Sequence, residues 1–316
     1  MIYPWQQSEW QQVRHQYQQQ RLAHALLLTG VDGLGQIEFA RELAQLKLCK
    51  QPQEKACGRC RHCHLFTTGG HPDFICLEPE ADKRVIKVDQ IRTVIARLAK
   101  TPQLAQSQVV VINALDQLNT KAANALLKTL EEPSGDVVFI LICRRLGLVP
   151  ITIVSRCQRL HFAVRDVSVT INWLQQQLPQ QQQLKVILKL AYGAPLQAIV
   201  LAERDILTLR DKLLKKLLAI KIGDSSLNGI DALLKNEVYD VLLVLRRLFE
   251  DICKCQLAIN TDKLANSDRI AQLQECAKLY SARHVQQQLD SLMQIENILH
   301  SGVHLNPQLA VESLLI

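Results

Sequence analysis

The pattern of hydrophobic and polar residues changes character near residue 164. Before it, short apolar runs rich in β-branched residues alternate with segments whose apolar positions recur every three or four residues. Such runs are typical of buried strands in a parallel sheet, and the segments between them of helices that cover it. The runs expected to form strands are residues 25–28, 74–77, 109–112 and 137–143. The first half is therefore predicted to have an α/β fold.

Helix signals are clearest in two places. Asn119 and Thr120 precede apolar residues at three- and four-residue spacing, and Pro133 follows them, which predicts a capped helix that ends before the proline. Beyond residue 164 the strand signals fade. One amphipathic stripe begins at Leu233 and Leu234 and continues over residues 238–252, and another covers residues 285–299. The C-terminal third is predicted to be a helical bundle.

Length, charge and composition narrow the class of protein. A chain of 316 residues suits two or three domains. The net charge of +7 is spread along the chain, which favours phosphate-bearing or acidic partners without indicating a dedicated DNA-reading domain. The N-terminus does not have the pattern of a secretory signal, and the longest apolar run, residues 137–143, is too short to span a membrane. We therefore expect a cytoplasmic protein without membrane contact.

A cluster of cysteines is the strongest local motif. Cys57, Cys60 and Cys63 follow one another at three-residue intervals, and Cys49 lies eight residues before the first. Four thiolates suit a closed, tetrahedral structural Zn²⁺ site, so residues 49–63 are predicted to form a zinc module. His62 and His64 are alternative ligands in place of Cys49. The cluster lacks the interleaved aromatic residues of a nucleic-acid-binding knuckle, which favours a structural role.

A glycine-rich segment follows the first expected strand. Gly30, Gly33 and Gly35 have the spacing of a phosphate-binding loop, in which backbone N–H groups hold phosphates, a lysine reaches the outer phosphates and a hydroxyl holds Mg²⁺. Here Gln36 stands in place of the lysine and Ile37 in place of the hydroxyl. Taken alone, the segment is equally consistent with an ordinary turn between a strand and a helix.

Three further strings resolve this ambiguity. Residues 109–118 read Val-Val-Val-Ile-Asn-Ala-Leu-Asp-Gln-Leu, residues 122–133 read Ala-Ala-Asn-Ala-Leu-Leu-Lys-Thr-Leu-Glu-Glu-Pro, and Ser155-Arg156-Cys157 follow. Together they resemble the clamp-loader branch of the AAA+ proteins. With the cysteine cluster and His71-Pro72-Asp73, the chain is most similar to the δ′ subunit family of the bacterial DNA polymerase III clamp loader. The resemblance extends over residues 20–163 and is weaker beyond.

The resemblance implies three domains. Residues 1–163 would form an AAA+-type P-loop domain with a degenerate loop and the zinc module, residues 164–205 a small helical lid, and residues 206–316 an all-α collar. A δ′ subunit would assemble with the ATPase (γ/τ) subunits and the δ subunit in a five-subunit ring. That ring loads the sliding clamp onto primer–template DNA for the DNA polymerase III holoenzyme, a DNA-directed DNA polymerase of the bacterial cytoplasm.

The departures from an active ATPase are equally informative. Active members have Asp-Glu where Asn113 and Ala114 stand, to support Mg²⁺ and polarise water, and a lid arginine where Leu196 stands. With Gln36 and Ile37 in the loop, we expect neither ATP binding nor ATP hydrolysis at this chain's own site. Asp116, near Asn113, fits the start of a helix better than a metal ligand.

Arg156 is interpreted differently, because an arginine finger acts on a neighbour's nucleotide. The Ser-Arg-Cys context implies that Arg156 serves this role in trans. The alternative is a structural arginine that caps a helix end or pairs with Glu131 or Glu132. Three other functions stay open: a clamp-loader ATPase that binds nucleotide despite its altered loop, a zinc-dependent nucleic-acid-binding module, and a scaffold without any finger.

Overall fold

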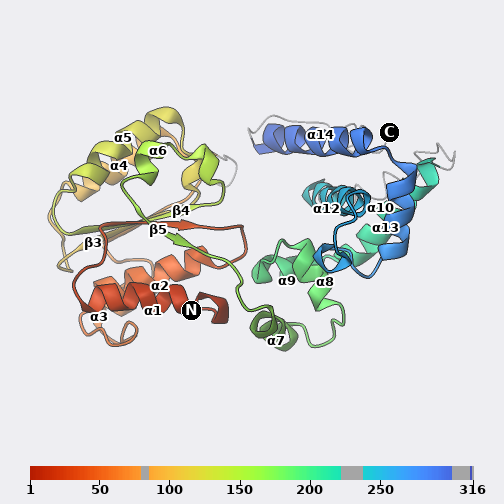
Figure 1. The fold of residues 1–316 in the computed structure, drawn as a ribbon. Coiled ribbons are helices and arrows are strands. Elements are labelled where there is room, and N and C mark those ends of the chain that lie inside the picture. Colours follow the sequence, from red (N-terminus) through yellow and green to blue (C-terminus); the bar gives the residue numbers. More distant parts are fainter. Residues whose placement is uncertain (80–84, 222–237, 301–313, 315–316) are drawn as a thin grey trace. The chain divides into compact units, whose positions relative to one another are not determined.

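The computed structural model describes residues 1–79, 85–221, 238–300 and 314. The chain folds into two compact units, Met1–Thr170 and Ile171–Ile316 (Figure 1). Each unit is described by itself. The predicted change from an α/β half to a helical half is confirmed.

A parallel sheet lies at the centre of the first unit. Its strand order is β2-β3-β4-β1-β5. The strands are β1 (Ala25–Thr29), β2 (Phe74–Leu77), β3 (Gln108–Ile112), β4 (Val137–Cys143) and β5 (Gln158–His161). All residues of β1, β3 and β4 are buried, because helices cover both faces of the sheet. The four predicted strands are confirmed.

Strand β5 was not predicted from the sequence. It pairs with β1 at the edge of the sheet, with Leu26 opposite Gln158 and Leu28 opposite Leu160. Leu160 is its only buried residue. An edge strand of this kind contributes a single apolar side chain to the core, so it leaves no apolar run in the sequence.

Helices cover the two faces of the sheet in separate groups (Figure 1). Helices α1, α2 and α3 lie on one face, and α4, α5 and α6 on the other. They are α1 (Gln7–Gln18), α2 (Gln36–Leu48), α3 (Arg61–Thr67), α4 (Val88–Leu98), α5 (Thr120–Glu131) and α6 (Ile151–Val154), with short 3₁₀ turns η1 (Pro4–Gln6), η2 (Leu115–Gln117) and η3 (Leu146–Leu148). The predicted cap of α5 is confirmed, since the Asn119 side chain accepts a hydrogen bond from the Ala122 N–H at 2.8 Å.

The described part of the second unit is helical. Its elements are α7 (Val167–Gln177), which begins at the end of the first unit, α8 (Leu184–Leu190), α9 (Pro195–Glu203), α10 (Ile206–Lys221), α12 (Val238–Gln256), η4 (Thr261–Lys263), α13 (Ile270–Leu279) and α14 (Ala282–His300). The predicted stripes over residues 238–252 and 285–299 form the buried faces of α12 and α14. Leu233 and Leu234 lie outside the described residues.

One apolar core runs through this second unit. It includes side chains of the short helices α8 and α9 and of the long helices α10 and α12, so residues on both sides of the predicted lid–collar boundary share it. Arg247 of α12 also ties the turn after α8 to the long helix. Its guanidinium lies 3.5 Å from the centre of the Tyr192 ring, and it donates to the Leu190 carbonyl at 3.3 Å. The division into a lid (164–205) and a collar (206–316) stays a prediction.

No single helix among the described residues is long and apolar enough to cross a membrane, although the bent pair α8 and α9 would suffice in length and composition when the two are taken together.

Candidate functional site

The glycine-rich segment forms the turn between β1 and α2, as the sequence predicted. Gly33 and Gly35 have φ angles of 82° and 81°, in the left-handed region that other residues rarely adopt. Space is also restricted at Gly35, where an added Cβ would lie 2.6 Å from the ring of Tyr3. Both conformation and close packing therefore require glycine at this position.

Side chains of the chain itself occupy the surroundings of this loop. Gln36, in place of the lysine, donates a hydrogen bond from its amide to the Val31 carbonyl at 3.0 Å. Gln6 is fully buried and donates to the carbonyls of Leu34 and Gly35, at 2.8 and 2.7 Å. These bonds fix the loop from within and from the N-terminal segment. The sequence offered no signal for Gln6, since it lies 28 residues away from Leu34.

Two further N-terminal residues complete this covering layer. The Trp5 indole N–H donates to the Leu34 carbonyl at 3.0 Å. The rings of Tyr3 and Trp5 are stacked, with centroids 4.9 Å apart and planes within 2°. The segment before α1 is thus packed onto the loop.

Charged residues at the carboxyl ends of the strands hold the other side of the loop. Arg144, directly after β4, forms a salt bridge with Asp32 of the loop at 2.9 Å, and its backbone N–H donates to Asp116 at 3.2 Å. Burial raises the pKa of Asp32, and the nearby Arg144 partly offsets this effect. The Asp116 carboxylate is only 2% exposed and lies 3.7 Å from the Arg145 guanidinium.

These contacts refine the sequence interpretation. Asp116 does lie in a short helical turn, η2, as expected, but its carboxylate also links η2 to the end of β4. Arg144 and Arg145 form ion pairs with Asp32 and Asp116. The signal that could have identified them is topological, because the carboxyl ends of parallel strands meet at one edge of a sheet. The positions of an ATPase's acidic pair hold Asn113 and Ala114, directly after β3.

Arg156 follows the short helix α6. Its guanidinium forms a salt bridge with Glu131 at the end of α5 and donates to the Thr152 carbonyl at 2.7 Å. The Arg156 side chain is 35% exposed, and that of Glu131 is 47% exposed. This is the pairing that the sequence allowed as the structural alternative. The finger role therefore stays a prediction, and the geometry leaves Arg156 accessible from the surface.

The four predicted metal ligands lie together. Cys49 follows the last residue of α2, Cys57 lies in the loop after it, and Cys60 and Cys63 lie at the start of α3. The sulfur atoms are 3.6 Å apart for Cys49 and Cys63, 3.9 Å for Cys57 and Cys63, and 4.0 Å for Cys49 and Cys60. All four lie within 4.8 Å of one another.

This geometry fits a tetrahedral metal ion. A tetrahedron with metal–sulfur bonds of about 2.3 Å has sulfur–sulfur edges of about 3.8 Å. The Cys57 N–H donates to the Cys49 sulfur at 3.3 Å, and the Cys63 N–H to the Cys60 sulfur at 3.4 Å, which supports negative charge on sulfur. Desolvation raises the pKa of Cys60, yet backbone N–H donors from Cys63 and Lys50 and the neighbouring thiols outweigh it, and the pKa falls to about 6. Burial raises the pKa of Cys49 and of Cys63.

The histidines near the cluster have another arrangement. The Nδ1 atom of His62 lies 3.4 Å from Nε2 of buried His71, and His71 Nδ1 accepts from the Asp73 N–H at 3.2 Å. His62 thus connects α3 to the turn before β2. The group of potential ligands consists of the four cysteines, so neither His62 nor His64 is needed to complete it.

Comparisons with known proteins agree with this picture. Residues 5–166 match the family described as "DNA polymerase III, delta subunit", and residues 204–316 match "DNA polymerase III, delta subunit, C terminal". DNA polymerase III subunit delta′ of Pseudomonas aeruginosa is 38% identical over 232 residues, 72% of this chain and 70% of the relative. The Escherichia coli protein of the same name is 31% identical over 317 residues, 99% of this chain and 94% of the relative.

A solved structure also aligns along most of the chain. It is a DNA polymerase III gamma subunit-related protein from Thermotoga maritima, 20% identical, with 97% of each chain covered and a TM-score of 0.46. The curated relatives and the two family matches, which together take in both units, decide the assignment. The chain belongs to the DNA polymerase III delta′ subunit family.

Proposed function

We propose that this chain is a non-hydrolysing stator subunit of a bacterial clamp loader, with Arg156 acting on ATP that is bound by a neighbouring subunit. The observation that carries the proposal is the filling of the loop by the chain's own side chains. Gln36 donates to a loop carbonyl from the position of a phosphate-binding lysine, and Gln6 holds two more loop carbonyls. Both features favour a structural loop over a nucleotide site.

Energetics support a role for Arg156 outside its present ion pair. A half-exposed pair such as Arg156 with Glu131 contributes roughly 0–1 kcal/mol, so separating it costs little. A charge-assisted hydrogen bond to a phosphate is worth about 1.5–3 kcal/mol. An arriving γ-phosphate would therefore compete well with Glu131 for the guanidinium. Glu131 is then the residue that holds Arg156 in place until the neighbour's nucleotide is present.

The partners follow from the family. We infer that the chain assembles with γ/τ ATPase subunits and a δ subunit in a five-membered ring in the cytoplasm. The ring would load the sliding clamp onto primer–template DNA. In this assembly the helices of residues 206–316 would serve as the collar.

The metal is proposed to be a single structural Zn²⁺ ion. The four sulfurs of Cys49, Cys57, Cys60 and Cys63 match its preferred ligand type and geometry. Four protein ligands close the coordination shell, which leaves no position for a substrate or a catalytic water. The ion would fix the segment between α2 and α3, where there is otherwise little regular structure.

The test is hydrolysis of ATP by a complex reconstituted from this chain with γ/τ and δ, in the presence of clamp and primed DNA. Arg156→Ala should lower the stimulated rate by about tenfold or more, since an arginine finger supplies roughly 10³- to 10⁵-fold at the site it serves. Arg159→Ala is the matched control, because Arg159 is an exposed arginine on the adjacent strand β5.

If the hydrolysis rate falls, gel filtration shows whether the ring still assembles or has come apart. A lower rate with the ring intact supports a finger acting in trans, and Arg156→Lys should restore little, because a lysine lacks the planar fork of the guanidinium. Equal rates for the natural chain and Arg156→Ala, with normal assembly, would reduce Arg156 to a structural partner of Glu131.

A further inference from the structure

A small polar pocket lies at the end of the sheet opposite the glycine-rich loop, where β2 begins and α4 ends. Its volume is about 130 Å³, and it is lined by residues before and within β2, at the end of α4, and in the loop to β3. The lining residues that matter below are Asp73, Arg97, Lys100 and Gln108. None of them belongs to the loop, the metal centre or the surroundings of Arg156.

The walls of this pocket are fixed by hydrogen bonds. The buried Asp73 carboxylate accepts three backbone N–H groups, from Gln103 at 2.6 Å, Leu104 at 2.8 Å and Ala105 at 2.7 Å. The Gln108 amide donates to the Lys100 carbonyl at 3.3 Å. The loop between α4 and β3 is thereby held against the start of β2, so the pocket exists before any ligand arrives.

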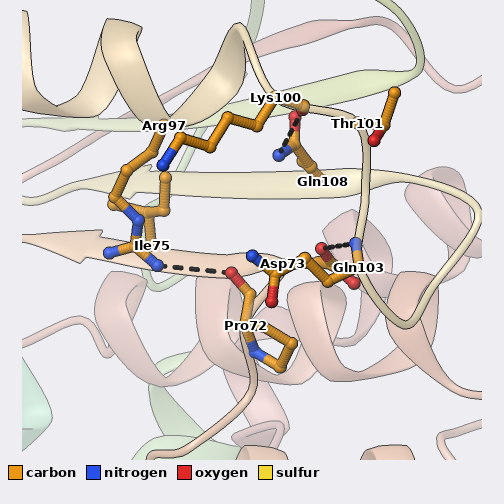
Figure 2. Close-up of a pocket in the computed structure, with 8 residues that line it drawn as sticks. All are labelled: Pro72, Asp73, Ile75, Arg97, Lys100, Thr101, Gln103 and Gln108. Atoms are coloured by element: carbon orange, nitrogen blue, oxygen red, sulfur yellow. Dashed lines mark hydrogen bonds between the residues drawn. The ribbon is translucent and has the colours of Figure 1, made fainter.

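Two cations converge on the pocket without an anion between them. Figure 2 shows Arg97 and Lys100 on the same side of it, with the Lys100 side chain extending back towards Arg97. Arg97 donates to the Pro72 carbonyl at 3.2 Å. Within the described part of the chain, neither cation forms a salt bridge, and the Lys100 ammonium has no hydrogen-bond partner. Neighbouring like charges repel each other, and a bound anion would remove that repulsion.

Asp73 does not supply the missing anion. Its two oxygens are used by the three backbone donors, which also offset its charge. The donors left for a ligand on this side of the pocket are the rest of the Arg97 guanidinium and the Lys100 ammonium. Arginine and lysine are side chains that typically hold a phosphate group.

We propose that this pocket binds a single phosphate group, as inorganic phosphate or as the phosphate of a small monoester, beside Arg97 and Lys100. The volume of about 130 Å³ is large enough for one phosphate group. The site is independent of the proposed arginine finger.

Calorimetric titration of the full chain with inorganic phosphate at low ionic strength tests the proposal. We expect saturable binding with a dissociation constant of about 1 mM, as for a small ligand with a few polar contacts. Arg97→Gln and Lys100→Gln should each weaken binding by about tenfold or more, the effect of losing one charge-assisted hydrogen bond. Arg92→Gln is the matched control, because Arg92 is an exposed arginine of the same helix and pairs with Asp89 outside the pocket.

Two probes define the ligand. Ribose 5-phosphate should bind if the phosphate of a monoester can enter, and acetate should bind more weakly than phosphate. Lys100→Gln guards against misfolding, since Lys100 is exposed and its ammonium forms no hydrogen bond or salt bridge within the described residues. The proposal is overturned if the natural chain shows no saturable phosphate binding, if acetate binds as tightly as phosphate, or if the two pocket variants bind phosphate like Arg92→Gln.

Discussion

The contacts of Gln6 with the glycine-rich loop lead to a quantitative prediction. Replacing Gln6 by alanine removes the side chain that connects the N-terminal segment to the loop, while the rest of the sheet is untouched. Gln6→Ala deletes three hydrogen bonds: those to the Leu34 and Gly35 carbonyls and one accepted from the Tyr3 N–H at 3.0 Å. We expect the loop and the start of α2 to open more often.

The free-energy cost of Gln6→Ala depends on which hydrogen bonds the two carbonyls keep. The Leu34 carbonyl keeps the Trp5 indole as a donor, and the Gly35 carbonyl keeps the Phe39 N–H at 3.0 Å. Neither carbonyl is therefore left unpaired in the core. Each lost bond is then worth about 0.5–1.5 kcal/mol, so the three together give about 2–4 kcal/mol.

Hydrogen exchange followed by mass spectrometry measures this free energy locally. A loss of about 2–4 kcal/mol corresponds to roughly 30- to 1,000-fold faster exchange in peptides that cover the loop, because 1.4 kcal/mol is a factor of ten. Peptides from β4 should keep their protection, since the hydrogen bonds of the Gln6 side chain go to Tyr3, Leu34 and Gly35 and not to that strand. Gln11→Ala is the control, because Gln11 is an exposed glutamine on the neighbouring helix α1.

One result would refute the reasoning. If Gln6→Ala exchanges within twofold of Gln11→Ala over the loop, the N-terminal segment does not hold the loop in solution. Uniformly faster exchange over the whole first unit would also contradict it, because the effect would then be global rather than confined to the loop.

Two further predictions concern the metal centre and Asp73. The purified chain should contain about one equivalent of Zn²⁺. Cys60→Ser should lower that content, and Cys76→Ser, the control, should leave it unchanged. A content of less than about half an equivalent, with all four thiols freely reactive, would contradict the site. Burial raises the pKa of Asp73, but its three N–H donors outweigh this and lower the pKa below its usual value. The carboxylate therefore stabilises the fold above about pH 4 and loses this contribution as the pH falls further. Asp73→Asn should lower the free energy of unfolding by about 1–3 kcal/mol at pH 7. Urea unfolding measured at several pH values should then show a smaller loss of stability at acid pH for Asp73→Asn than for the natural chain. An unchanged loss of stability at acid pH would show that Asp73 is not the group that titrates.

Local signals predicted much of the fold. The four apolar runs formed strands, Asn119 formed the cap of α5, and the cysteine spacing brought the four thiols together. These features depend on residues close in sequence, where periodicity and spacing are informative. Strand β5 was not predicted, because Leu160 is the only buried residue among its four.

The contacts of the site were less accessible to sequence analysis. Gln6 and Leu34, or Arg144 and Asp32, are distant in sequence, and their meeting depends on how the strands are ordered in the sheet. Arg156 illustrates a different limit. Its pairing with Glu131 was predicted as one alternative. A role in trans depends on contacts with a second protein, which the contacts within this chain do not reveal.

The continuous core of the second unit has a mechanical consequence. Helices α8 and α9 bury side chains against the same apolar interior as α10, α12 and α14, and Arg247 pins the Tyr192 turn to α12. A force on α9 would therefore be transmitted to α14 with no flexible hinge between them in the described residues, because close-packed interiors transmit strain. We expect the described helices of this unit to move together as one rigid body.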